Sequence, residues 1–509
     1  NGRFDDGYEG RRAAQERYLE PHGIPPSLAL LSRRFAALAA RACLRQLDLT
    51  PLRKFKGATW DEGKTPEVAP EVVKALQSRL ACEQHLRGTP SGELDAETRR
   101  ALEEFERRNR IYARASLQGE TLAALRTEPV ELERRTLVRV LLERAVLDLG
   151  IIEDGSAYGA MPVRGPKNVE PAPDLVRALE QRIIAVFGLD DVRGVQHFYA
   201  RFEPSLAAAH AAVAIEPLPL PAYHAPDMEL WLEIDRGDLY YEFPFDEAGK
   251  PLPFDLERGP TMTLYAQRGE RVWPLVLYHT TIGGWRIRRE NGKVFWQYKE
   301  SKTGTRAWHR IVTAPVWLPP PATPSETLVA SFRRTSDGSE FRALNLNLIG
   351  PSFASAYGLV AAYHQRIVSR EGGELKLGPD DGMRTHGSSD YTSIWRTVSN
   401  GCHRLHNHQA MRLVNFVLRH RPHRAVGHVR TSYRTRVRTA GFEDHVDIKQ
   451  TGYEFNLLRP MEVHVSPGRV RGELKQPLRT HVPAADDASA WPTFLLTPTG
   501  PARPQTAED

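Results

Sequence analysis

The hydrophobic residues of this chain change their spacing at one proline-rich segment, residues 216–221. Before it, the segment 174–214 has the spacing of a helix, whereas beyond it Leu230, Leu232 and Ile234 alternate with mostly polar residues. A helix repeats its buried face about every 3.6 residues and a strand every second residue, so the two regions require different structures. The sequence therefore predicts a multidomain α+β protein with a helical N-terminal half and a mainly β second half.

The length of 509 residues is enough for about three or four domains. Two further segments, Val272–Ile282 and Leu344–Ile349, also show the alternation expected of strands. The complete division predicted from these patterns is an N-terminal helical segment (1–69), a helix–turn–helix unit (70–126), a helical connector (127–224), a β-rich domain (225–466) and a proline-rich tail (467–509).

A cysteine and a histidine in the β-rich half have the character of a catalytic pair. Cys402 follows Gly401, and His386 lies sixteen residues upstream. A thiol is mostly protonated at neutral pH, so a reactive cysteine needs a neighbouring base or cation. We predict that Cys402 is a nucleophile for acyl transfer, with His386 as its base and, in the imidazolium form, the partner of its thiolate.

The turn before the cysteine suits a site that stabilises negative charge. Acyl transfer builds charge on the substrate oxygen, which backbone N–H groups stabilise. We predict that the amides of Gly401 and Cys402 supply this oxyanion hole. Helical spacing downstream, with Asn407 as N-cap, predicts that the loop runs into a helix N-terminus whose dipole favours the thiolate.

The combined pattern, His386-Gly387 followed by Ser399-Asn400-Gly401-Cys402-His403-Arg404, resembles the signature of the L,D-transpeptidases with a YkuD-type catalytic domain. These enzymes cross-link bacterial peptidoglycan. The resemblance implies a β-sandwich-like catalytic domain, with Cys402, His386 and Gly401 as catalytic residues. It further implies a substrate-binding set that consists of Arg404, Ser399, Gly387, Asn400, His403 and Arg384.

Two positions depart from the family pattern. The residue after the cysteine is usually small and aliphatic but here is His403, and the position two before His386 is usually aliphatic or aromatic but here is Arg384. Neither change removes a reacting group. Both leave open the acceptor preference and the partner that orients His386.

Other segments resemble the larger, periplasmic members of this family. Residues 70–126 resemble a peptidoglycan-binding helical module, with a generic helical domain as the alternative, and Leu132–Leu149 resembles the linker helix that follows. Residues 313–319 resemble a Trp-Pro stretch of these enzymes, and residues 350–359 resemble the Gly-Pro segment that precedes their catalytic histidine. The charged segment 319–343 corresponds to a lid over the catalytic cleft, with an ungated surface insertion as the alternative.

Three closely spaced histidines, His403, His406 and His408, raise the question of a metal site. Zinc requires further ligands in fixed geometry, and neither a His-Glu-x-x-His nor a paired Cys-x-x-Cys motif is present. We therefore predict solvent-facing histidines, no metal and no cofactor.

Charge and cysteine content bear on partners and location. The net charge of +6 suits a polyanionic cell wall, and no nucleic-acid motif or membrane-spanning apolar run accompanies it. The sequence begins at Asn1 rather than at methionine, which suggests that an N-terminal piece is missing, either a cleaved signal segment or another segment, so export is not visible directly. The resemblance implies an exported protein of the periplasm or cell envelope. Cys43 and Cys82 form either a disulfide or two buried thiols.

The function that the resemblance implies is attack by Cys402 on the third stem residue of peptidoglycan, release of D-alanine and transfer of the acyl group to a neighbouring stem. Transfer to water, in an L,D-carboxypeptidase or endopeptidase, is the alternative within the same chemistry. A non-catalytic wall-binding scaffold is the alternative from another class. The sequence specifies neither the acceptor nor the oligomeric state.

Overall fold

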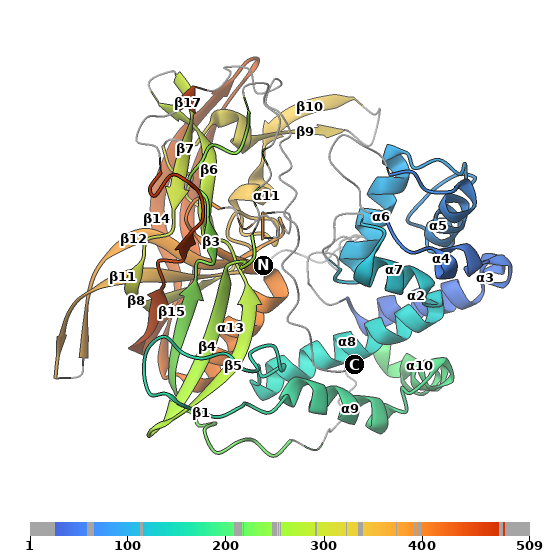
Figure 1. The fold of residues 1–509 in the computed structure, drawn as a ribbon, viewed down its shortest axis with the longest axis horizontal. Coiled ribbons are helices and arrows are strands. Elements are labelled where there is room, and N and C mark those ends of the chain that lie inside the picture. Colours follow the sequence, from blue (N-terminus) through green and yellow to red (C-terminus); the bar gives the residue numbers. More distant parts are fainter. Residues whose placement is uncertain are drawn as a thin grey trace. The chain divides into compact units, whose positions relative to one another are not determined.

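The chain forms an α+β structure whose helices and strands are shown in Figure 1. The computed structural model describes residues 26–477 and 482–483, apart from interruptions at 59–65, 112–115, 208–215, 217, 247–251, 253, 255, 291–292, 322, 334–338, 373, 391–392, 395–396 and 398. Residues 1–25 and most of the predicted tail lie outside the described residues. The chain divides into one unit of residues 1–151 and 174–219 and a second of residues 152–173 and 220–509.

The first unit is helical, as predicted. One of its hydrophobic clusters joins Leu76 and Leu80 to Leu102, Phe105 and Leu125. The described helices of this unit are α2 (Leu28–Ala39), α3 (Ala42–Gln46), α4 (Thr50–Lys54), α5 (Pro70–Cys82), α6 (Ala96–Arg108), α7 (Gly119–Arg126), α8 (Pro129–Leu149), α9 (Leu175–Phe187) and α10 (Val192–Ala207).

The predicted helix–turn–helix unit is present as α5, α6 and α7, and its turn is fixed by specific hydrogen bonds. Asp95 caps α6 by accepting from the Thr98 amide at 2.7 Å. Buried Gln77 of α5 accepts from the Gly92 amide and donates to the Glu93 carbonyl. The hydrophobic cluster also contains Leu49, Leu52 and Leu132 and therefore extends beyond the predicted bounds 70–126.

A disulfide joins Cys43 of α3 to Cys82 at the end of α5, with their Cα atoms 5.8 Å apart. It closes a loop of 39 residues in sequence. The structure thus decides between the two alternatives that the sequence left open, and it favours the disulfide.

The second unit is built on a ten-stranded mixed sheet in the order β1-β5-β4-β2-β15-β8-β11-β12-β13, with β14 paired to β15. The strands of this sheet are β1 (Asn168–Val169), β2 (Glu229–Asp235), β4 (Thr261–Arg268), β5 (Arg271–His279), β8 (Gly304–Thr313), β11 (Val360–Glu371), β12 (Glu374–Ser388), β13 (His403–His406), β14 (His423–Thr439) and β15 (Phe442–Val465). Smaller sheets contain β3 (Asp238–Leu239) with β16 (Arg469–Val470), and β6 (Gly283–Glu290) with β7 (Lys293–Glu300) and β17 (Val482–Pro483).

One helix, α13 (Asn407–His420), packs against β11, β12 and β13. Its Leu413, Phe416 and Val417 are buried in the same cluster as Trp308 and Leu405 of the sheet. The cluster lies on one face of the sheet, which leaves the opposite face of β12 and β13 for polar side chains.

Two local predictions were wrong. Leu344–Ile349 is not a strand throughout, because Asn345 caps a short helix, α11 (Leu346–Ile349), after β10 (Glu340–Leu344). Asn407 is not the N-cap of the downstream helix but its first residue, and the cap position is His406.

The segment predicted to form a lid, 319–343, contains regular structure. After η2 (Ser325–Leu328), β9 (Val329–Arg333) pairs with β10 as an antiparallel hairpin, visible as two projecting strands in Figure 1. Residues 322 and 334–338 lie outside the described residues, and whether the hairpin gates the cleft stays a prediction.

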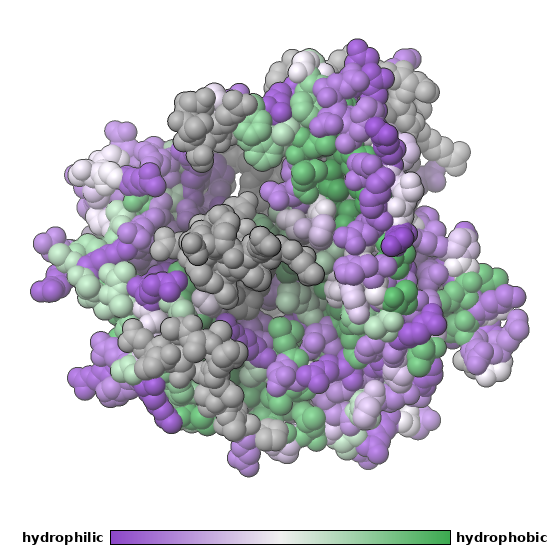
Figure 2. All heavy atoms as spheres, turned by 180° about the vertical axis from the view of Figure 1, so that it is seen from behind, coloured by the Kyte–Doolittle hydropathy of each residue, from purple (hydrophilic) through white to green (hydrophobic). Residues whose placement is uncertain are grey.

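Polar residues cover much of the face shown in Figure 2, with hydrophobic residues in smaller patches. Within the described part of the chain, no helix combines the length and the apolar character that crossing a bilayer requires.

Candidate active site

The structure brings His386 and Cys402 to neighbouring strands. His386 lies in β12, and Cys402 immediately precedes β13. These strands run parallel, with Thr385 opposite His403 and His386 opposite Arg404. Extending this register by one residue places Arg384 beside Cys402, at the strand spacing of about 4.8 Å.

His386 is buried and is held in one tautomer. Its Nδ1 lies 2.7 Å from the Gly387 carbonyl oxygen, which can only accept, so Nδ1 carries the proton. Nε2 is therefore left with a lone pair that can take a proton. The ring also packs edge-on against Tyr357, with centroids 5.2 Å apart.

Burial, followed by the positive charge of Arg404, lowers the pKa of His386 to about 3. The imidazole is therefore neutral at physiological pH. Burial also raises the pKa of the half-buried Cys402 thiol above its usual value, although Arg384 and Arg404 oppose this effect. The resting pair is a thiol and a neutral base, and the imidazolium–thiolate pair expected from the sequence is not the resting form.

Short polar side chains form hydrogen bonds with the backbone of the loop from Ser399 to Cys402. Ser399 Oγ donates to the Cys402 carbonyl at 2.6 Å, and Thr281 Oγ1 donates to the same oxygen at 2.8 Å. Ser301 Oγ lies 3.0 Å from the Gly401 carbonyl oxygen and also contacts the Ile282 carbonyl oxygen, so these two acceptors share its one proton. Sequence reasoning missed Thr281 and Ser301, because they lie about one hundred residues upstream and belong to no local motif.

Gly401 has a backbone role that differs in part from the predicted one. Its φ of +97° suits glycine, and an added Cβ would lie 3.1 Å from the Glu300 carbonyl oxygen. Its amide donates to Ser399 Oγ at 3.1 Å, so this N–H is engaged inside the loop and is not directed to a substrate oxygen. The role of the Cys402 amide in an oxyanion hole stays a prediction.

Arg404 and Arg384 are both anchored beside the pair. Arg404 Nη1 donates to Ser393 Oγ at 2.8 Å and lies 3.6 Å from Asp390. Both terminal nitrogens of Arg384 donate to Asp380. The two arginines place fixed positive charge near Cys402 and His386.

His403 does not lie where the predicted substrate-binding set requires. It is fully buried, and its Nδ1 donates to the Thr281 carbonyl at 3.0 Å. Its ring centroid lies 5.4 Å from that of buried His364. Because His403 alternates with Arg404 along β13, its side chain faces the interior. The predictions of a substrate contact and of a solvent-facing side chain were therefore wrong for this residue.

Two further residues of the predicted substrate-binding set are Asn400 and Gly387. Asn400 is exposed on the loop. Gly387 allows close approach of Asn407, because an added Cβ would lie 2.3 Å from Asn407 Oδ1. Asn407 in turn accepts from the Leu359 amide and donates to the Phe353 carbonyl.

The predicted helix dipole does not act directly on the thiol. The four residues of β13 separate Cys402 from α13, and the dipole effect is confined to about the first turn of a helix.

Among the described residues, no group of three or more His, Cys, Asp or Glu side chains is placed to hold a metal ion. His406 and His408 are partly buried, with ring centroids 5.9 Å apart.

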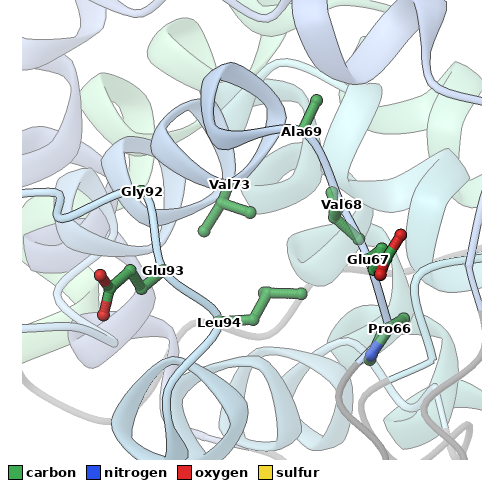
Figure 3. Close-up of a pocket in the computed structure, with 8 residues that line it drawn as sticks. All are labelled: Pro66, Glu67, Val68, Ala69, Val73, Gly92, Glu93 and Leu94. Carbon is green, nitrogen blue, oxygen red and sulfur yellow. The ribbon is translucent and has the colours of Figure 1, made fainter.

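The helical unit has a cavity of its own, about 510 Å³ in volume. Figure 3 shows the aliphatic side chains of Val68, Val73 and Leu94 around it, with the carboxylates of Glu67 and Glu93 on opposite sides. The cavity lies between the start of α5 and the turn that Gln77 stabilises.

Comparison with known proteins gives no assignment, since neither a protein-family model nor a curated protein matches the chain.

Proposed function

We propose that this protein is a cysteine L,D-transpeptidase of the YkuD type, with residues 225–466 as its catalytic domain. The proposal depends chiefly on one observation. His386 lies on β12, Cys402 immediately precedes the parallel neighbour β13, and Nδ1 of His386 donates to the Gly387 carbonyl. This arrangement leaves Nε2 to take the thiol proton, which a general base must do.

The proposed reaction has two steps. The Cys402 sulfur attacks the carbonyl carbon of the third stem residue as its proton passes to His386. The C–N bond to terminal D-alanine breaks, and His386 returns the proton to the leaving amine. An amine of a neighbouring stem then attacks the thioester and loses a proton to His386, and the C–S bond breaks to regenerate the thiol. Nucleophile and base are both side chains, so no cofactor is needed.

The disulfide supports the proposed location. Structural disulfides persist in oxidising compartments and are rare in the bacterial cytoplasm. The Cys43–Cys82 pair is therefore in keeping with an exported protein of the periplasm or cell envelope. The proposed macromolecular partner is peptidoglycan.

We further propose that the cavity of the helical unit binds wall material. Its aliphatic lining and flanking carboxylates suit a ligand with both apolar and cationic or hydrogen-bonding groups, such as a stem peptide. Leu94→Ala should weaken sedimentation of the protein with sacculi, whereas Glu97→Ala, a change in α6 that does not line the cavity, should not. Equal sedimentation of both variants with the unaltered protein would contradict a binding role for this cavity.

The activity is tested with purified tetrapeptide-stem muropeptides, whose products are separated and weighed by mass spectrometry. Transpeptidation predicts dimers lighter than two substrates by one D-alanine. Cys402→Ala and His386→Gln should both abolish them and leave the circular dichroism spectrum unchanged. Tripeptide monomers in place of dimers would instead identify a hydrolase, and no Cys402-dependent product would support the scaffold alternative.

A further inference from the structure

We propose that Arg384, rather than His386, supplies the permanent positive charge that favours the Cys402 thiolate in the free protein. The inference deepens the proposed acyl-transfer function and rests on it. It concerns a position at which this chain departs from the pattern of the family it resembles.

The sheet register places Arg384 where such a charge is effective. Thr385 is opposite His403 at the first pair of the parallel ladder, and Arg384 and Cys402 are the residues that precede this pair. The Arg384 backbone is also a hydrogen-bond partner of the Cys402 thiol. Arg384 and His386 are two residues apart on β12 and so lie on the same face. The Cys402 sulfur is 3.9 Å from the Gly382 carbonyl oxygen, which confirms that the thiol lies beside this stretch of β12.

The guanidinium of Arg384 is fixed by its surroundings. Its two terminal nitrogens donate to Asp380, and its Cζ lies 3.8 Å from the ring centroid of Tyr363. The residue is only 9% exposed, and its Nε is buried without a hydrogen-bond partner among the described residues. A charge held in such a weakly hydrated place interacts more strongly with a neighbour than it would in water.

Five groups act on the thiol or face it. Burial disfavours the Cys402 thiolate most, and the Arg384 charge opposes burial most strongly, followed by the Arg384 backbone hydrogen bond and the Arg404 charge. The Asp380 charge acts against the thiolate. Tyr357 is neutral, because burial and the adjacent thiolate raise its pKa. His386 is neutral as well. An arginine stays charged at every pH at which the protein is folded, so its effect does not depend on proton uptake.

The two members of the ion pair should have opposite effects on the thiol. Removing Arg384 takes away the favourable charge, whereas neutralising Asp380 takes away an unfavourable one. If the pair merely maintained the shape of β12, breaking it from either side would change the thiol in the same direction. This difference distinguishes an electrostatic role from a structural one.

The test is the rate of Cys402 alkylation by iodoacetamide as a function of pH, measured by intact mass on the full oxidised chain. Because the other two cysteines form a disulfide, Cys402 is the free thiol, and Cys402→Ala gives the background. Arg384→Met should raise the apparent pKa of the thiol enough to reduce the thiolate fraction at neutral pH about tenfold. Arg384→Lys should restore most of the thiolate fraction at neutral pH. Asp380→Asn should lower the apparent pKa of the thiol.

Arg310→Met is the matched control, because Arg310 also lies over the Tyr363 ring, at 4.3 Å, but on β8 and away from the β12–β13 ladder. It should leave the titration unchanged. Unchanged titration in Arg384→Met, or a shift in the same direction in Asp380→Asn, would overturn the inference. Neither result depends on a stem substrate, so a failure here is distinct from a failure to form muropeptide dimers.

Discussion

The protonation state of individual side chains determines how this site can work. His386 and Cys402 rest as neutral imidazole and thiol, so in the proposed reaction attack is coupled to proton transfer and does not begin from an imidazolium–thiolate pair. Fixed arginine charge lowers the cost of reaching the thiolate. The proposed general-base catalysis would keep the thiol unreactive until a substrate is bound.

Buried neutral histidines also make stability depend on pH. Burial lowers the pKa of His403 to about 4 and that of His364 well below its usual value. Below about pH 6.5 these histidines become protonated in the unfolded chain but stay neutral in the folded chain. The free energy of unfolding therefore decreases as pH falls toward 4. Each such group contributes a slope of about 1.4 kcal/mol per pH unit in this window.

His403→Asn should therefore unfold with a shallower dependence on pH between 6.5 and 4 than the unaltered protein, by about one group's slope. Asparagine retains an N–H donor for the Thr281 carbonyl but does not titrate in this window. Urea unfolding at several pH values measures the two slopes. Parallel curves for both proteins would show that His403 is not buried in its neutral form.

The residues of the pair could be predicted from the sequence, because the glycine and serine around Cys402 and the His-Gly dipeptide are local. Their protonation states could not, since burial and the charges of Arg384 and Arg404 depend on long-range packing. The same limit applies to Thr281, whose hydroxyl links the Arg404 amide to the Cys402 carbonyl.

At the level of elements, two short parallel segments of β12 and β13 form the site, and the contact between β12 and α13 sets their position. That contact is tight at Gly387, where Asn407 Oδ1 occupies the space of a side chain. The alternation of Leu230, Leu232 and Ile234 correctly predicted β2, because burial on one face leaves a local signal. The sequence carried no such signal for β13, because four residues of mixed polarity are too few to show a period of two.

Gly387→Ala should lower the unfolding free energy by about 1–3 kcal/mol, the usual cost of overpacking, and should reduce turnover because β12 must shift. Urea unfolding and the muropeptide assay measure the two effects. In Gly387→Ala/Asn407→Ala the clash is relieved, so the double variant should lose less stability than the sum of the single variants. Additive losses would show that Asn407 and Gly387 are not in contact.

At the scale of the whole molecule, the order of the chain does not match its division into units. Residues 152–173 interrupt the helical unit in sequence but pack with the β-rich unit, where buried Glu153 accepts hydrogen bonds from Tyr223 and pairs with His224. The sequence predicted one connector over 127–224, because nothing local distinguishes a segment that returns to a distant partner. The hydrophobic cluster around α5 and α6 likewise includes Leu49 and Leu52, which lie outside the predicted module.

The proposed function requires Cys402 to be a nucleophile that forms an acyl-enzyme, and the family resemblance provides a direct probe of this property. L,D-transpeptidases characteristically react with carbapenems, whose strained lactam carbonyl presents the same electrophile as a stem peptide. Intact-protein mass spectrometry after carbapenem exposure should show one adduct on the unaltered protein and none on Cys402→Ala. An unmodified protein, or an adduct that persists in Cys402→Ala, would contradict the central claim.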